Sequence, residues 1–282
     1  MKDIKLIATD LDGTLLDKNG LIPDYTKQTI LDCIDKGILF MIVSGRTHET
    51  ARKPAVLAGL SIIIASANGA RIDQTPNGPT IYKRLMNKAE CDSVYKILDE
   101  CPGKLHSYIR GINFVRSEAG SDPSPRIVLD GLPDMPLQWV FNEPERVRKE
   151  ASENVLKFEV YSKDYAMLDS YKRKLEDIGM LVTSSAREDI EIQPQDSSKG
   201  LAVRWMAQKL GLTKAQIMCF GDYTNDASML KEAGIAIAMQ NGVDELKQIA
   251  THIAPPNTEE GEARMIRTLV FGEDDVWPDI QK

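Results

Sequence analysis

The sequence predicts an α/β protein with an open, mostly parallel sheet that is interrupted by an inserted α+β segment. The short apolar runs of the chain are almost continuous, as is typical of parallel strands that helices cover on both faces. Helical patterns lie between these runs, whereas the middle of the chain follows another pattern. The expected core strands are Ile4–Thr9, Ile38–Val43, Ile62–Ser66, Ile217–Phe220 and Ile235–Ala238.

The segments between and beside these runs repeat their apolar residues with helical spacing. Gly37, Gly211 and Gly234 directly follow three of the segments, as C-terminal caps of helices do. Strands that alternate with helices favour parallel pairing through helical crossovers. The expected helices are Tyr25–Lys36, His48–Ala58, Gly200–Leu210, Asp226–Ala233, Val243–Ala250 and Glu259–Val270.

The pattern changes from about Arg84 to about Arg187. Short strands of alternating polarity join two expected helices there, and the prolines between Pro123 and Pro144 predict turns. We therefore expect a core domain over residues 1–83 and 188–282, with an inserted domain over residues 84–187. The expected helices of this part are Lys88–Glu100 and Tyr165–Ile178, and the expected strands are Leu105–Ile109, Asn113–Arg116, Leu156–Tyr161, Leu181–Thr183 and, just past the insertion, Ile190–Gln193.

The charge balance and the hydropathy pattern exclude some functions. The formal net charge of −7 argues against general binding to nucleic-acid phosphates. No apolar run approaches the roughly 18 residues that span a bilayer, and the start of the chain lacks the apolar region of a secretory signal. We therefore expect a cytoplasmic protein without nucleic-acid or membrane partners. The cysteines have no paired metal or redox spacing, so we expect reduced thiols at Cys33, Cys91, Cys101 and Cys219.

Two aspartates follow the first apolar run, in the sequence Asp10-Leu11-Asp12-Gly13-Thr14. Residues i and i+2 of an extended chain face the same side, so Asp10 and Asp12 should enter one space at the carboxyl end of the strand. In open α/β sheets that end is where ligands bind. An aspartate-rich turn that merely ends a strand is the alternative interpretation.

A second acidic cluster follows another apolar run, in the sequence Phe220-Gly221-Asp222-Tyr223-Thr224-Asn225-Asp226. Acidic groups from two strands of one sheet can converge on a cation that prefers oxygen ligands. Mg²⁺ suits such a site, because it accepts few carboxylates and keeps water ligands for phosphate oxygens. A helix N-cap is the alternative interpretation of this cluster.

Two further segments offer groups that bind anions. Ser44-Gly45-Arg46 follows a strand and opens a helix, where a hydroxyl and free backbone N–H groups can hold an anion. Lys199 precedes the helix that is expected from Gly200, and a lysine is a point charge well suited to phosphate. For a single lysine, an ordinary surface position is the alternative.

These segments, in this order, resemble the motifs of the haloacid dehalogenase superfamily of phosphotransferases, and within it the Cof-type sugar phosphatases of class IIB. The resemblance covers the whole chain and implies a Rossmann-like core whose inserted α+β domain is a cap over the catalytic face. Two further segments, Ala67-Asn68-Gly69-Ala70 and Asn257-x-Glu259-x-Gly261, are also similar to this branch.

The resemblance implies that this is a Mg²⁺-dependent phosphatase. Asp10 is then the nucleophile that forms an aspartyl-phosphate. Asp12 protonates the leaving alcohol and later accepts a proton from water. The metal is bound by Asp10, the main-chain carbonyl of Asp12 and Asp222, while Asp226 orders water around it.

The same resemblance implies which residues hold the phosphoryl oxygens. These are Ser44, the Gly45 amide, Asn225 and the catalytic Lys199. Arg46 either contacts the substrate or pairs with acidic residues. The family often has asparagine at the position of Tyr223, which puts the packing beside the metal in question.

The substrate class that the resemblance implies is a small phosphorylated metabolite, such as a sugar phosphate or pyridoxal phosphate. A phosphomutase or another phosphotransferase that uses the same aspartate is an alternative, and so is a non-catalytic phosphate-binding regulatory module. The specificity should reside in the cap. Arg110-Gly111-Ile112-Asn113 is a candidate contact loop there, with a plain hairpin turn as the alternative. The oligomeric state is unknown.

Overall fold

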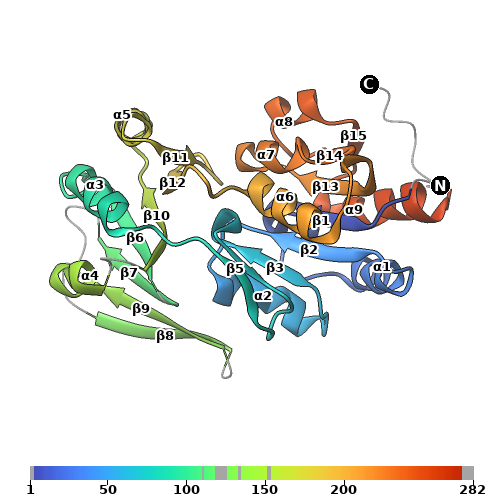
Figure 1. The fold of residues 1–282 in the computed structure, drawn as a ribbon, viewed down its shortest axis with the longest axis horizontal. Coiled ribbons are helices and arrows are strands. Elements are labelled where there is room, and N and C mark those ends of the chain that lie inside the picture. The colour runs from blue at the N-terminus through green and yellow to red at the C-terminus, as the bar shows by residue number, and fades with distance from the viewer. Residues whose placement is uncertain (1–2, 110, 118–125, 133–134, 151–153, 275–282) are drawn as a thin grey trace.

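The computed structural model describes residues 3–109, 111–117, 126–132, 135–150 and 154–274. Two separate sheets organise these residues (Figure 1). The larger sheet has eight strands in the order β15-β14-β13-β1-β2-β3-β4-β5. The strands from β15 to β3 are parallel, whereas β4 and β5 are antiparallel at one edge. Its strands are β1 (Leu6–Thr9), β2 (Leu39–Val43), β3 (Ile63–Ser66), β4 (Arg71–Asp73), β5 (Thr80–Lys83), β13 (Ile217–Gly221), β14 (Ile235–Met239) and β15 (His252–Ala254).

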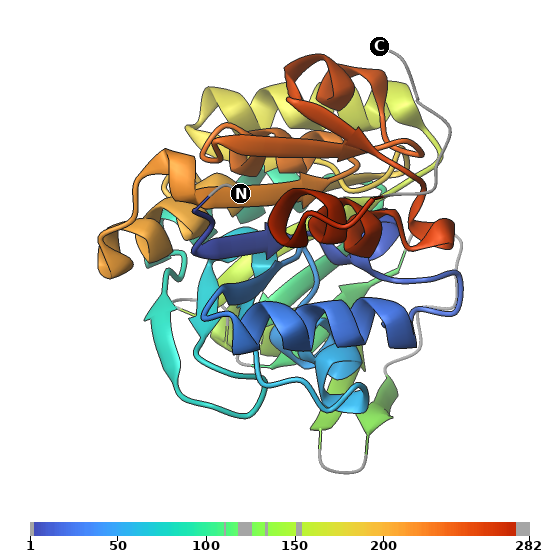
Figure 2. The same cartoon turned by 90° about the vertical axis from the view of Figure 1, so that its right-hand side faces the viewer.

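Helices cover both faces of the larger sheet, which explains the continuous apolar runs of its strands. Alternate residues of β1 face opposite sides: Ile7 packs with α1, α2 and α9, and Leu6 packs with α6, α7 and α8. Figure 2 shows α1 and α9 side by side on the first of these faces. The helices are α1 (Asp24–Asp35), α2 (His48–Leu57), α6 (Lys199–Leu210), α7 (Ala227–Leu230), α8 (Asp244–Ile249) and α9 (Gly261–Ile266). The predicted α/β fold class is confirmed.

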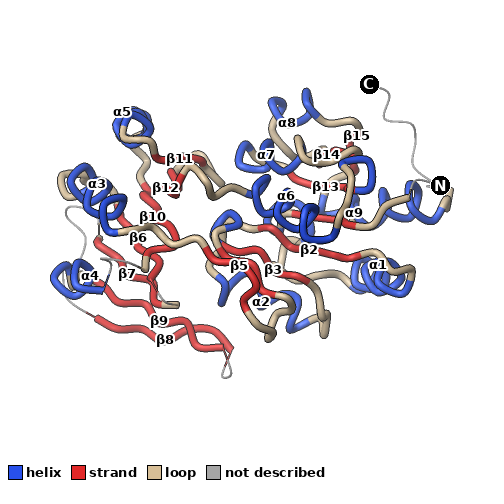
Figure 3. Tube along the Cα trace, viewed as in Figure 1, coloured by secondary structure: helices blue, strands red, loops and turns tan. Residues whose placement is uncertain are grey.

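The second sheet has seven strands in the order β11-β12-β10-β6-β7-β9-β8. Its neighbours are antiparallel except β7 and β9. Three helices cover the face that is turned away from the larger sheet (Figure 3). The elements are α3 (Lys88–Leu98), β6 (Lys104–Ile109), β7 (Ile112–Arg116), β8 (Arg126–Leu132), β9 (Met135–Phe141), α4 (Pro144–Glu150), β10 (Val155–Tyr161), α5 (Tyr165–Asp177), β11 (Met180–Thr183) and β12 (Asp189–Pro194).

One expectation for the middle of the chain needs correction. The proline-containing segment, expected to form turns, contributes the strands β8 and β9. This is possible because β8 itself contains no proline, and because Pro136 of β9 lies near the end of the β8–β9 pair and outside the residues of β9 that pair with β7. Strand β12 belongs to the second sheet, which therefore extends past residue 187 to Pro194. The division of the chain into domains stays a prediction.

No helix among the described residues is long and apolar enough to cross a membrane. The four cysteines are free and buried.

Candidate active site

Two neighbouring strands bring three aspartates together. Strands β1 and β13 run parallel, with Thr9 opposite Phe220, so the residues that follow each strand leave the sheet at the same edge. One carboxylate oxygen each of Asp10, Asp222 and Asp226 lies within 4.8 Å of the others. The two acidic motifs that are far apart in the sequence therefore form one cluster.

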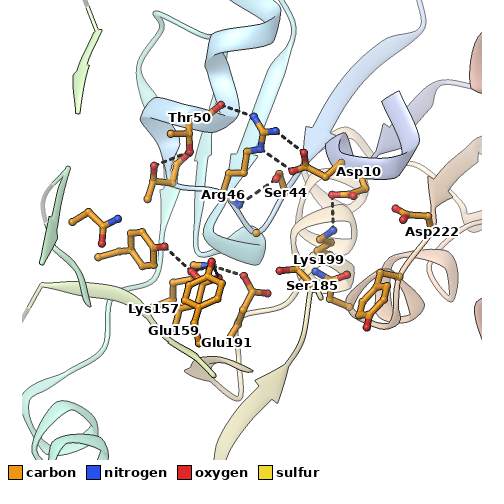
Figure 4. A pocket seen from close by; sticks show the side chains of 18 of the residues that line it. Asp10, Ser44, Arg46, Thr50, Lys157, Glu159, Ser185, Glu191, Lys199 and Asp222 are labelled. Carbon is orange, nitrogen blue, oxygen red and sulfur yellow. Dashed lines mark hydrogen bonds and ion pairs between the residues drawn. The ribbon is translucent and has the colours of Figure 1, made fainter. Parts of the chain in front are cut away.

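Lys199 is the cation inside this cluster. It is the first residue of α6, only 1% of its surface is exposed, and its Nζ donates to Asp10 Oδ1 at 2.7 Å and to Asp226 Oδ1 at 2.6 Å. Figure 4 shows the bond to Asp10. Asp226 also accepts hydrogen bonds from the backbone N–H groups of Asp222 and Tyr223. Asp226 is thus fixed by its own loop, and it holds the lysine beside Asp10.

The cluster has more acidic groups than basic ones. Burial raises the pKa of Asp10 well above its usual value, although the charge of Lys199 opposes the shift. Burial, and then the charge of Asp226, raise the pKa of Asp222 to about 7. Burial alone would lower the pKa of Lys199, but Asp10 and Asp226 outweigh it and raise that pKa. One lysine does not balance three close carboxylates, so a bound cation would stabilise the group.

The donor set fits a small divalent cation. The oxygens of Asp10 and Asp222 are hard ligands, the type that Mg²⁺ prefers. Asp222 lies against the turn after β1: Thr14 Oγ1 donates to its Oδ1 at 2.9 Å, and a Cβ on Gly13 would come within 2.3 Å of its Oδ2. Gly13 has a φ of +74°, and the missing side chain leaves room for the carboxylate.

The Asp12 side chain turns away from this cluster. It is 63% exposed, and its carboxylate accepts two hydrogen bonds from Arg46, at 2.7 Å from Nε and 2.5 Å from Nη2. Arg46 also reaches the main-chain oxygen of Thr50 (Figure 4). Arg46 is thus paired with an acidic residue, and its contact with a substrate stays a prediction. A role for the Asp12 main-chain carbonyl in metal binding stays a prediction.

The predicted phosphate-binding residues line one pocket of about 230 Å³, together with Asp10 and Asp222 of the acidic cluster. Ser44 and Gly45 follow β2, and Asn225 follows β13; Ser44 and Asn225 are buried. Among the predicted catalytic, phosphate-binding and metal-binding residues, Asp226 alone does not line the pocket; it is fully buried and bonded to Lys199. The pocket is lined from the core by Asp10, Asp12, Ser44, Gly45, Arg46, Thr47, Thr50, Lys199, Asp222, Tyr223 and Asn225.

Apart from Asn113 of the candidate contact loop, the residues of the opposite wall of the pocket were not predicted from the sequence. This wall comes from one face of the second sheet, and Figure 4 shows part of it across from Asp10 and Lys199. The signal was the alternation of polar and apolar residues in Lys157-Phe158-Glu159-Val160-Tyr161, where every second side chain faces away from the apolar core of that sheet. The lining residues are Tyr108, Asn113, Trp139, Lys157, Glu159, Tyr161, Ser185 and Glu191.

Asn68 connects the two sheets. It follows β3 in a left-handed conformation with a φ of +50°, and its Nδ2 donates to Glu191 Oε2 at 2.8 Å and to Gln193 Oε1 at 3.0 Å. The expected contact loop at residues 110–113 is partly described: Arg110 lies outside the described residues, whereas Asn113 lines the pocket. Tyr223 also lines it, beside the acidic cluster.

The chain is similar to known proteins over almost its whole length. Residues 7–266 match the model of the haloacid dehalogenase-like hydrolases. A phosphatase of Bacillus subtilis, named for 5-amino-6-(5-phospho-D-ribitylamino)uracil, is 31% identical over 271 residues, which is 95% of this chain and 97% of the relative.

Two solved structures share the fold. A haloacid dehalogenase-like hydrolase from B. subtilis superposes with a TM-score of 0.82 at 22% identity, covering 95% of this chain and 100% of that one. The class IIB sugar phosphatase BT4131 superposes with a TM-score of 0.76 at 17% identity, covering 95% and 99%.

Proposed function

Because the chain belongs to the haloacid dehalogenase-like hydrolases, we propose that it hydrolyses small phosphomonoesters with Mg²⁺, through an aspartyl-phosphate on Asp10. It is a phosphoric monoester hydrolase of the Cof-type branch. The observation that carries the proposal is the cluster of Asp10, Asp222 and Asp226 around Lys199 in a pocket that is lined by the phosphate-binding motifs.

Asp10 is the nucleophile of this proposal. Its oxygen forms a bond to phosphorus, while the bond between phosphorus and the alcohol oxygen of the substrate breaks. The attack requires an ionised carboxylate, which burial opposes and which Lys199 favours at 2.7 Å. Lys199 therefore favours the charged form of Asp10 and orients its carboxylate.

Asp12 transfers the protons. It gives a proton to the leaving alcohol oxygen, and then takes one from the water that attacks the aspartyl-phosphate and restores Asp10. A proton carrier must be accessible to the leaving group and held in place. Its exposure and its two hydrogen bonds from Arg46 support this role.

The phosphoryl oxygens are held by groups around the pocket. Ser44 offers a hydroxyl, Gly45 a backbone N–H, Asn225 an amide and Lys199 a charge, and all four residues line the pocket. Asp10, the main-chain carbonyl of Asp12 and Asp222 are the proposed ligands of the metal. When bound, Mg²⁺ would neutralise the carboxylates and the phosphate, so that two anionic groups can approach each other.

The proposed domain division follows the two sheets. The core would hold the catalytic residues, and the inserted domain, with its boundary moved past β12, would act as a cap over the pocket. A phosphorylated ribitylamino-pyrimidine, the compound in the name of the B. subtilis relative, is one candidate substrate beside sugar phosphates and pyridoxal phosphate.

The experiment is an assay of phosphate release from p-nitrophenyl phosphate, followed by a screen of phosphorylated metabolites ranked by kcat/KM. We expect release that requires Mg²⁺, stops in excess chelator and needs no sugar-phosphate activator. Full activity in chelator would remove the metal from the proposal. Release only after a sugar bisphosphate is added would favour the phosphomutase alternative.

A further inference from the structure

The second sheet presents one continuous row of polar side chains to the pocket. Lys157 lies opposite Tyr108, Tyr108 opposite Asn113, and Asn113 opposite Trp139 on successive strands. Side chains that are opposite each other across strands point to the same face of the sheet. A leaving group in the pocket therefore meets this row directly.

The cation of this wall is already paired. Lys157 is 2% exposed, and its Nζ lies against Glu191 and 3.2 Å from Glu159. Burial alone would lower the pKa of Lys157, but the two glutamates outweigh it and raise that pKa. One lysine against two glutamates leaves a formal charge of −1 on these three groups.

The hydroxyl donors of the wall are also in use. Tyr108 donates to Glu159 Oε2 at 2.5 Å, and Tyr161 donates to Glu159 Oε1. Acceptor capacity remains, because each carboxylate oxygen has two lone pairs. Asn113 is 1% exposed, and within the described part of the chain its Oδ1 has no hydrogen-bond partner. The tyrosine hydroxyls and Lys157 are thus engaged, whereas Asn113 Oδ1 and the carboxylate oxygens can still accept hydrogen bonds from a ligand.

On the basis of the proposed function, we propose that Asn113, Glu159 and Glu191 determine specificity for the leaving group. They select leaving groups that are neutral or cationic and that bring hydroxyl or amino donors. They discriminate against leaving groups with a carboxylate or a second phosphate. An anion there would meet the net negative charge of Lys157, Glu159 and Glu191, which are buried, so water screens their charge weakly.

The test compares three probes that share a phosphate on carbon six. Glucose 6-phosphate is neutral in its leaving group, glucosamine 6-phosphate is cationic and 6-phosphogluconate is anionic. Each is measured as a substrate and as an inhibitor of p-nitrophenyl phosphate hydrolysis. We expect the neutral and cationic probes to exceed the anionic probe by about tenfold or more in kcat/KM or in affinity.

The outcomes separate this inference from the proposed function. If p-nitrophenyl phosphate is not hydrolysed with Mg²⁺, the proposed function fails. If it is hydrolysed but the three probes behave alike, or the anionic probe is preferred, the specificity inference is overturned.

Variants test whether the side chains of the second sheet that line the pocket cause this preference between probes. Glu191→Gln removes one negative charge and should reduce the preference for neutral over anionic probes by about threefold or more. Asn113→Asp adds a charge, so the preference should increase, which keeps the test informative if Glu191→Gln does not fold. Glu176→Gln, an exposed change on α5, is the matched control. Unchanged preference in both wall variants would contradict the assignment.

Discussion

Burial of Asp10 opposes the charge that a nucleophile needs. Its pKa is raised well above the usual value by burial, and Lys199 at 2.7 Å is the nearby group that opposes this shift. Lys199 is fixed in turn by Asp226, which accepts its second hydrogen bond. The reactivity of one carboxylate thus depends on two residues that it does not adjoin in the sequence.

Replacing Asp10 by asparagine should remove turnover without unfolding the protein. The carboxamide has nearly the same size but is a poor nucleophile, so kcat should fall by about a hundredfold or more. Phosphate release measures the activity, and circular dichroism checks the fold. Asp35→Asn, an exposed change on α1, is the control. Activity close to that of the wild type would exclude Asp10 as the nucleophile.

At the scale of a single element, the turn after β1 determines the space that is available to the acidic cluster. Gly13 and Gly20 both have a positive φ, of +74° and +73°. A Cβ on Gly13 would meet Asp222 Oδ2 at 2.3 Å, whereas a Cβ on Gly20 would have nothing within 4 Å. Substitution of either glycine therefore strains the backbone, but only the substitution of Gly13 places an atom against the acidic cluster.

Gly13→Ala should displace Asp222 and weaken metal binding. We expect the Mg²⁺ concentration for half-maximal activity to rise by about tenfold or more. Gly20→Ala is the matched control, because it adds the same backbone strain in open space. Equal Mg²⁺ requirements in the two variants would show that Asp222 is not positioned by this turn.

The position of a residue within its strand determines whether its place in the site could be predicted from the sequence. Asp10, Ser44 and Asp222 were predictable because each follows a parallel strand, and parallel strands end at one edge of a sheet. The roles of Lys157 and Glu191 could not be predicted. Alternation identifies the polar face of a strand, but it does not show that this face lines a pocket. Strands β8 and β9 were missed because the prolines that flank them, and Pro136 inside β9, are typical of turns.

At the scale of the whole molecule, a buried acid connects helix α9 to strand β1 in the middle of the larger sheet. Glu262 of α9 is 2% exposed and accepts a hydrogen bond of 2.7 Å from Thr9 at the end of β1. Burial raises the pKa of Glu262 to about 8, and the bond from Thr9 opposes the shift. The folded state therefore holds a proton that the unfolded chain, with its lower pKa, releases more easily.

This shift predicts a loss of stability as the pH rises. The contribution of Glu262 is fully present below its unfolded pKa of about 4.5 and is lost as the pH rises through about 8. Glutamine resembles the protonated acid, so Glu262→Gln should be more stable than the wild type at pH 9, by several degrees in Tm, and nearly equal to it at pH 4. Thermal unfolding across this range, with Glu245→Gln as an exposed control on α8, measures the difference. Parallel curves for wild type and variant would contradict a buried, protonated Glu262.

The proposal as a whole requires two displacements at phosphorus, first by Asp10 and then by water. Each in-line displacement inverts the configuration of the phosphorus atom, so two restore it. The direct measurement uses a phosphorothioate substrate made chiral with oxygen isotopes and hydrolysed in isotopically labelled water. Net retention of configuration is the result that capture of phosphorus by Asp10 predicts, and net inversion, the mark of direct attack by water, would contradict it.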